Sequence, residues 1–128
     1  MRILLDTHIL LWMIGDSRSL STSALQVLSD ETNELFFSAV SIAEVSIKHQ
    51  KNPALMSISP NDVIFAAEEC GIKELAFDSR HAAALSALAP YHSDPFDRML
   101  LAQANSEGIK IMSHDRQFPQ YGDFVIHV

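Results

Sequence analysis

The sequence predicts an α/β protein with a parallel sheet, because short apolar runs alternate along the chain with segments of helical periodicity. The first apolar run, residues 3–5, ends at Asp6 with no loop residue between them. Such a run is typical of a central strand buried on both faces. Ligands of open parallel sheets bind beyond the carboxyl ends of the strands, so Asp6 is expected where such sites form.

Five strands and six helical segments account for most of the chain. The strands are expected at residues 3–5, 35–37, 72–77, 109–112 and 124–128. The helical segments are expected at residues 9–14, 20–28, 38–48, 63–70, 80–88 and 94–107. No linker or internal repeat divides the sequence, so we expect residues 1–128 to form a single domain.

Composition limits the class of protein and its location. A hydrophobic fraction of 48% excludes a disordered chain, and no apolar run approaches the ~20 residues that span a bilayer, so no membrane partner is expected. The single cysteine, Cys70, has no internal disulfide partner, which favours a reducing, cytoplasmic location. We expect Cys70 to pack as a small apolar residue.

The formal charge of −7 excludes a broad basic face that would coat nucleic acid. It does not exclude an enzyme that processes nucleic acid at a metal site, because acidic residues that hold divalent cations count as negative in the sequence.

Four carboxylates are placed where a parallel sheet collects ligands: Asp6, Glu44, Asp97 and Asp115. Asp6 and Asp115 follow predicted strands, while Glu44 and Asp97 lie near the amino ends of predicted helices. Clustered carboxylates repel one another unless a cation lies between them. Mg²⁺ and Mn²⁺ prefer oxygen ligands, and their chemistry suits hydrolysis of phosphodiester bonds.

Two of these acids also have a structural interpretation as parts of helix caps. Glu44 completes a capping box with Ser41, unless the helix starts one turn earlier at Ser38. Asp94 suits an N-cap, and Asp97, three residues later, then interacts favourably with the positive end of the helix dipole. Both interpretations remain open from the residues alone.

The other two acids have structural alternatives as well. Asp6 can cap the helix that follows it, and Asp115 can belong to an ordinary turn. Three histidines, His8, His92 and His114, lie close to proposed acidic positions, but their spacing matches no compact zinc motif. We expect these histidines to support the acids from outside or to lie on the surface.

Basic residues near the same segments, Lys48, Arg98 and Arg116, can contact phosphates, although single charges of this kind more often lie on solvated surface.

Several short motifs follow one another over essentially the whole chain. They are Leu4-Leu-Asp6-Thr-His8 with Leu10-Leu-Trp12, Ser38-Ala-Val-Ser-Ile-Ala-Glu44, Asp94-Pro-Phe-Asp97-Arg98 with Leu100-Leu-Ala-Gln-Ala104, and Ser113-His-Asp115-Arg-Gln-Phe118. In this order and spacing the motifs resemble the PIN-domain family. Within that family the chain is most similar to the VapC type, the ribonuclease toxins of bacterial and archaeal toxin–antitoxin pairs.

The resemblance implies a five-stranded parallel sheet in the order 3-2-1-4-5 between helices. It also implies metal-binding acids at Asp6, Glu44 and Asp97, with Asp115 as the fourth and Asp94 as an auxiliary acid or only a helix cap. The small hydroxyl residues near such a site fall on Thr7, Ser41 and Ser113.

The activity implied by the resemblance is that of an endoribonuclease toxin that requires Mg²⁺ or Mn²⁺ and cleaves RNA. Such proteins are usually homodimers and are silenced by a cognate antitoxin, whose tail commonly covers the groove. An acidic crevice complements a basic tail, in keeping with the charge of −7.

Two alternative functions belong to other classes. A receiver-like signalling module would use Asp6 and Asp78, but the chain lacks the second acid beside Asp6 and the lysine after the last strand that such a module needs. The other alternative is a PIN fold that binds metal and a protein partner without hydrolysis, which intact acidic positions leave open.

Overall fold

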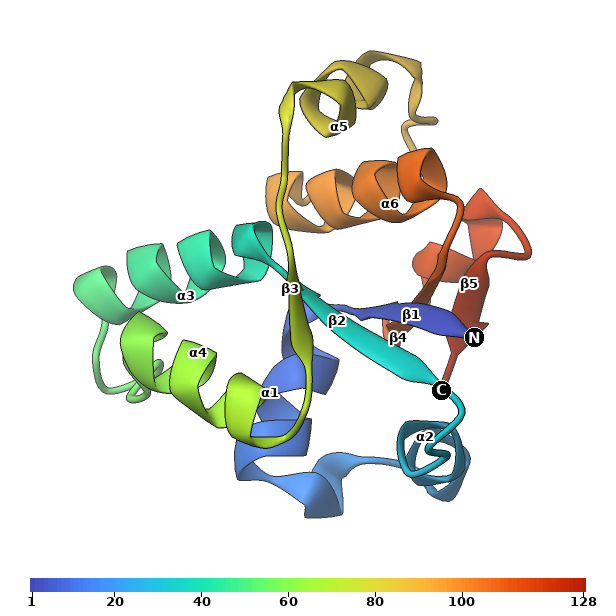
Figure 1. The fold of residues 1–128 in the computed structure, drawn as a ribbon. Helices are drawn as coiled ribbons and strands as arrows, with labels where there is room; N and C mark the ends of the chain where they lie inside the picture. Colours follow the sequence, from blue (N-terminus) through green and yellow to red (C-terminus); the bar gives the residue numbers. More distant parts are fainter.

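The computed structural model describes residues 1–128 and has a five-stranded sheet at its centre (Figure 1). The strands are β1 (Arg2–Leu5), β2 (Glu34–Ser38), β3 (Lys73–Leu75), β4 (Lys110–Ser113) and β5 (Val125–His127). All neighbouring strands pair in parallel, in the order β3-β2-β1-β4-β5. The predicted fold class and strand order are therefore confirmed.

Six α-helices flank the sheet. They are α1 (Thr7–Gly15), α2 (Thr22–Leu28), α3 (Ala39–Lys51), α4 (Pro60–Glu69), α5 (Ser79–Ala84) and α6 (Pro95–Glu107). The helix predicted at residues 80–88 is shorter than expected, because its second half tightens into the 3₁₀ turn η2 (Leu85–Ala87). Two further 3₁₀ turns, η1 (Ser17–Ser19) and η3 (Phe118–Tyr121), lie in connections.

The side chains of the central strand alternate between two buried cores. Ile3 and Leu5 pack into the core formed with α1, α2 and α4, whereas Leu4 packs into the core formed with α6. All three are completely buried. Both faces of the sheet are thus covered, which explains why β1 is continuously apolar rather than alternating with polar residues.

Two expectations based on composition can be compared with the structure. Cys70 is exposed at the carboxyl end of α4, so the expectation that it packs as a small apolar residue is wrong. None of the helices has the length and apolar character needed to cross a bilayer.

The strand order brings three chain reversals to one edge of the sheet. β1 lies between β2 and β4, and all three run in the same direction. The residues that follow them, which are Asp6, the start of α3 and the turn at Asp115, therefore meet at the carboxyl edge. α3 also packs against α6, which brings the two helices that carry Glu44 and Asp97 together.

We expect Leu101→Ala to destabilise the protein by about 2–5 kcal/mol, because Leu101 is completely buried in the core beneath α6 and its truncation leaves a cavity. Leu55→Ala is the matched control, since Leu55 is 84% exposed. Urea unfolding of both variants measures the difference. Equal midpoints for the two variants would contradict the assigned core.

Candidate active site

Asp6 occupies the position between β1 and α1 and acts as the helix cap. Its Oδ1 accepts a hydrogen bond from the backbone N–H of Ile9 at 2.9 Å, and its Oδ2 accepts one from the Ser113 hydroxyl. Burial raises the pKa of Asp6, and the hydrogen bonds from Ser113 and Ile9 partly oppose that increase. Asp6 therefore caps α1 and also faces the other acids. Its predicted role as a helix cap and its predicted place in an acidic site are compatible.

Glu44 lies on the second turn of α3, because the helix is capped by Ser38 rather than by Ser41. The Ser38 hydroxyl accepts a hydrogen bond from the Val40 N–H at 3.0 Å, so the capping box between Ser41 and Glu44 does not form. The Ser41 hydroxyl instead lies 2.8 Å from the Thr7 hydroxyl, in a buried hydrogen bond that joins α3 to α1.

Only one of the two carboxylate oxygens of Glu44 has a hydrogen-bond partner. Its side chain is 5% exposed, and its Oε2 lies 2.5 Å from the ammonium of Lys48. Its Oε1 is buried and has no hydrogen-bond partner. The hydrogen bond to Glu44 is the main reason that the pKa of Lys48 is raised, and the charges of Asp94 and Asp97 add to it.

Asp97 lies in the first turn of α6, as the sequence predicted. Asp94 is the N-cap, and its Oδ1 accepts a hydrogen bond from the Asp97 N–H at 3.0 Å. Burial raises the pKa of Asp97 to about 7, and the negative charges of Asp94, Asp6 and Glu44 add to this shift while His92 opposes it. Asp97 is therefore electrostatically coupled to Asp94 at the start of its own helix and to acids from two other segments, Asp6 and Glu44.

Asp115 follows β4 and is fixed by two hydrogen bonds. Its Oδ1 accepts one from the Gln117 N–H at 2.8 Å, and its Oδ2 accepts one from Nε2 of His92 at 2.8 Å. Burial alone would raise the pKa of Asp115, but these hydrogen bonds outweigh burial and lower it. Asp115 therefore ionises more readily than an ordinary aspartate, in contrast to Asp6 and Asp97.

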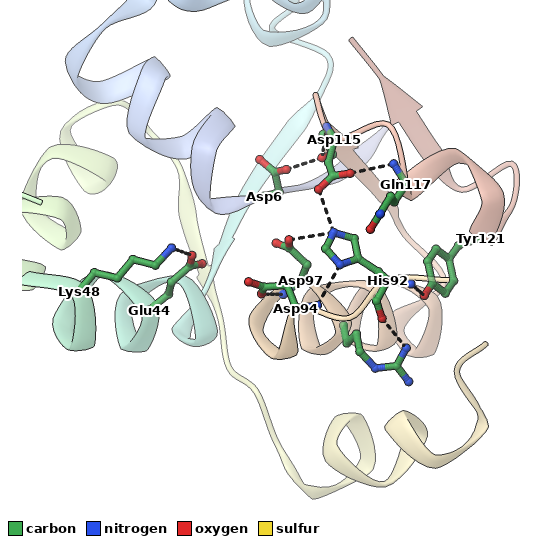
Figure 2. A network of polar contacts seen from close by, with 11 residues as sticks. Asp6, Glu44, Lys48, His92, Asp94, Asp97, Asp115, Gln117 and Tyr121 are labelled. Carbon is green, nitrogen blue, oxygen red and sulfur yellow. Dashed lines mark hydrogen bonds and ion pairs between the residues drawn. The ribbon is translucent and has the colours of Figure 1, made fainter. Parts of the chain in front are cut away.

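The acids surround a common space at the carboxyl edge of the sheet (Figure 2). Asp6, Asp97 and Asp115 line one cavity of about 300 Å³ together with His8, Trp12 and His114. Glu44 does not line this cavity but faces the same space from α3. The structure therefore brings together three of the predicted residues directly and the fourth at their side.

His92, which the sequence placed near the acids as a supporting or surface residue, supports two of them directly. It is buried, and its Nε2 lies 2.8 Å from Oδ2 of Asp115 and 3.1 Å from Oδ2 of Asp97. Its Nδ1 accepts a hydrogen bond from the Asp94 N–H at 3.1 Å, so the ring proton is on Nε2. His92 therefore bridges two acids as a hydrogen-bond donor in the metal-free protein, and its Nε2 lies close enough to both carboxylates for the three residues to share a metal ion.

Arg98 and Tyr121 hold the segment that carries His92. The Arg98 guanidinium donates hydrogen bonds to the carbonyl oxygens of Leu88, Ala89 and His92. The Tyr121 hydroxyl donates to the Ala89 carbonyl at 2.7 Å and accepts from the His92 N–H at 2.8 Å. Arg98 therefore fixes the loop at residues 88–92. The sequence suggested either a phosphate contact or a solvated surface position for Arg98, and the structure shows neither.

The donor set fits a hard divalent cation. The buried Oε1 of Glu44 is an unpartnered acceptor, and the pKa of Asp97 is raised by burial and, in addition, by the neighbouring negative charges. Both observations indicate room for a positive charge at the site. Carboxylate oxygens suit Mg²⁺ and Mn²⁺, and the site contains no thiolate. The alternative pair of Asp6 and Asp78 is not formed, because Asp78 caps α5 and does not line the cavity.

The fold and the site define an α/β protein with a carboxylate-lined cavity at the carboxyl edge of a five-stranded parallel sheet. The chain belongs to the PIN-domain family, whose sequence model matches residues 3–123. No curated protein sequence matches the chain.

Solved structures that share the fold include three VapBC complexes. VapBC2 from Rickettsia felis, bound to a DNA fragment from its promoter, is 14% identical with a TM-score of 0.69, and the match covers 100% of this chain and 98% of that chain. DNA-bound VapBC from Salmonella typhimurium is 14% identical with a TM-score of 0.67, covering 99% and 98%. VapBC-1 from nontypeable Haemophilus influenzae is 15% identical with a TM-score of 0.61, covering 94% and 92%.

In the metal-free protein, Asp97→Asn is expected to increase stability at pH 8. The folded-state pKa of Asp97 is about 7, above the ordinary aspartate value of 3.8, so the folded wild type holds this proton more tightly than the unfolded chain does. Its stability therefore decreases as the pH rises from about 4 to about 7, and asparagine removes this decrease.

Thermal unfolding in excess chelator at pH 5 and pH 8 measures this effect. The melting temperature of Asp97→Asn should exceed that of the wild type at pH 8, and the gap should shrink at pH 5. A variant less stable than the wild type at both pH values would show that ionisation of the buried Asp97 does not control the stability of the metal-free site.

Replacing His92 should change the pKa of Asp115. His92→Phe keeps a planar ring but loses the Nε2 donor, so the pKa of Asp115 should rise, whereas His92→Gln retains an N–H donor and should preserve more of the shift. Titration of the ¹³C-labelled carboxyl group by NMR measures both variants. An unchanged pKa in His92→Phe would exclude this hydrogen bond as a cause.

Proposed function

We propose that this chain is a divalent-metal-dependent endoribonuclease of the VapC type, in which Asp6, Glu44, Asp97 and Asp115 hold Mg²⁺ or Mn²⁺ and form the catalytic group. The observation that carries this proposal is the meeting of the four acids at one edge of the sheet, with a buried oxygen of Glu44 left without a partner. Membership of the PIN-domain family supports it.

A bound divalent cation supplies activation of the attacking water and stabilisation of the leaving oxygen of the phosphodiester. The chain's own residues position the acids for that role. Ile9 and Ser113 fix the two oxygens of Asp6, and His92 keeps Asp115 and Asp97 close together. Lys48 neutralises one oxygen of Glu44 and leaves the other free for a cation.

The proposed substrate is RNA. The resemblance to VapC ribonucleases supports this choice, and the charge of −7 is compatible with it when cations offset the acids at the site. Phosphate groups would then approach the cavity through the cation rather than through a basic surface.

The proposed partners are a cognate antitoxin and a second copy of the chain. The three similar structures are described as VapBC, and an acidic cavity in a chain of charge −7 complements a basic segment of an antitoxin. The proposed homodimer is based on the resemblance to VapC proteins alone.

We propose that the protein is located in the cytoplasm, because an exposed, unpaired Cys70 suits a reducing compartment.

Cleavage of a mixed structured RNA by the purified protein tests the proposed activity. Fragments should appear with Mn²⁺ or Mg²⁺ and be absent with excess chelator. We expect the cleavage rate to fall by about 100-fold or more in each of three variants, Asp97→Asn, Glu44→Gln and Asp115→Asn. Weaker metal binding would raise the activation free energy by several kcal/mol, because the metal no longer stabilises the transition state.

Asp62→Asn is the matched control, since Asp62 is an exposed acid on α4 that does not line the cavity. It should cleave RNA at the wild-type rate. Metal binding that depends on Asp6 and Asp97 but produces no fragments would instead favour a non-hydrolytic interaction module. Full activity of Asp97→Asn would contradict the assignment of the site.

A further inference from the structure

An aromatic cluster lies beside the acids, and the proposed chemistry does not use it. Its members are Trp12, His8 and His114, which line the same cavity as Asp6, Asp97 and Asp115. The Trp12 ring centroid lies 6.0 Å from that of His8 and 5.7 Å from that of His114. The cavity is therefore lined by three carboxylates and three ring side chains.

The cluster combines side chains from α1 and from the segment that follows β4. His8 and Trp12 are four residues apart on α1, so their side chains lie on the same face of that helix. His114 follows β4, and its Nδ1 lies 2.6 Å from the Val128 carbonyl. The ring of His114 also stacks on His127, with a centroid distance of 6.3 Å and an angle of 17° between the planes.

Two members of the cluster, Trp12 and His114, also line a second, more apolar hollow. This second hollow has a volume of about 110 Å³. Its other lining residues include Ile9, Leu20 and Val128. A flat, largely apolar group extending from a ligand phosphate at the acids would reach aromatic surface here.

Core packing accounts for only part of this arrangement. Trp12 packs against the core around α1 but remains partly exposed, while His8 and His114 are both exposed. Nucleobases stack on aromatic side chains, and such stacking tolerates any base because every base has a flat π-face. A basic peptide segment would match the acids but has no need of a row of aromatic rings.

We propose that Trp12, His8 and His114 form a nucleobase-binding subsite, which stacks an unpaired base next to the phosphate held at the acids. The placement next to that phosphate rests on the proposed function. The subsite requires single-stranded nucleic acid, because bases within a duplex are already stacked on both faces and paired at their edges. Recognition of a loop or an unpaired end of an RNA follows from this geometry.

Trp12 is the single tryptophan of the chain, so intrinsic fluorescence reports on the subsite alone. The wild-type protein is titrated with an eight-nucleotide oligouridylate, once with chelator and once with Ca²⁺. The controls are an abasic strand of equal length and charge and an RNA duplex. We expect the oligouridylate to quench the fluorescence and the abasic strand and the duplex to leave it nearly unchanged.

Variants test the energetic contribution, with anisotropy of a labelled oligouridylate as the readout. Trp12→Ala should weaken binding by about 5- to 150-fold, the range that corresponds to ~1–3 kcal/mol for one stacked base. Trp12→Phe keeps an aromatic face and should bind within a few-fold of the wild type. Phe65→Ala is the matched control, because Phe65 is an aromatic residue on α4, 66% exposed and outside the cavity.

The titration of the wild type does not depend on whether Trp12→Ala folds. Equal quenching by the abasic strand would overturn the proposal, and so would quenching by a basic peptide but not by the oligouridylate. RNA cleavage that survives Trp12→Ala with unchanged affinity would overturn the subsite alone. Base-dependent quenching without RNA cleavage would support the subsite while the nuclease assignment failed.

Discussion

The constraint on which the rest of the site depends is the burial of like charges at one edge of the sheet. Asp6 and Glu44 are buried, Asp97 is mostly buried, and their mutual repulsion contributes to a pKa of about 7 for Asp97. Without compensation such a group would loosen the edge where the central strands end. The neighbouring residues reduce that repulsion: Lys48 pairs with Glu44, and His92 lies between Asp97 and Asp115.

That compensation is incomplete in a way that is relevant to function. Lys48 neutralises one oxygen of Glu44, Ser113 donates to Asp6, and His92 donates to Asp115, yet Oε1 of Glu44 remains without a partner. Figure 2 shows Lys48 beside Glu44, and His92 between Asp97 and Asp115, while Asp6 faces the same space. Under the proposed function, this incomplete compensation lowers the stability of the metal-free protein and leaves oxygens available to a cation.

Much of the fold and part of the site follow from local sequence. The apolar runs predicted all five strands, and Asp6 and Asp115 were recognisable because each directly follows a strand. The helix start at Ser38 was one of two possibilities, and the structure decided it because Ser41 is engaged by Thr7, 34 residues away in sequence. The predictions for Cys70 and Arg98 were wrong for the same reason. The exposure of Cys70 and the hydrogen bonds of Arg98 depend on how segments pack together, which local sequence does not show.

The sequence by itself determined the strands, the helices and which acids stand at their ends, because periodicity and capping are set by neighbours within a few residues. Tertiary structure alone decided that His92 donates to Asp115, 23 residues away, and that Trp12 packs beside His114. It also decided that one oxygen of Glu44 is left unpaired. These features depend on distances between segments that only the packed sheet and helices bring together, so no local pattern encodes them.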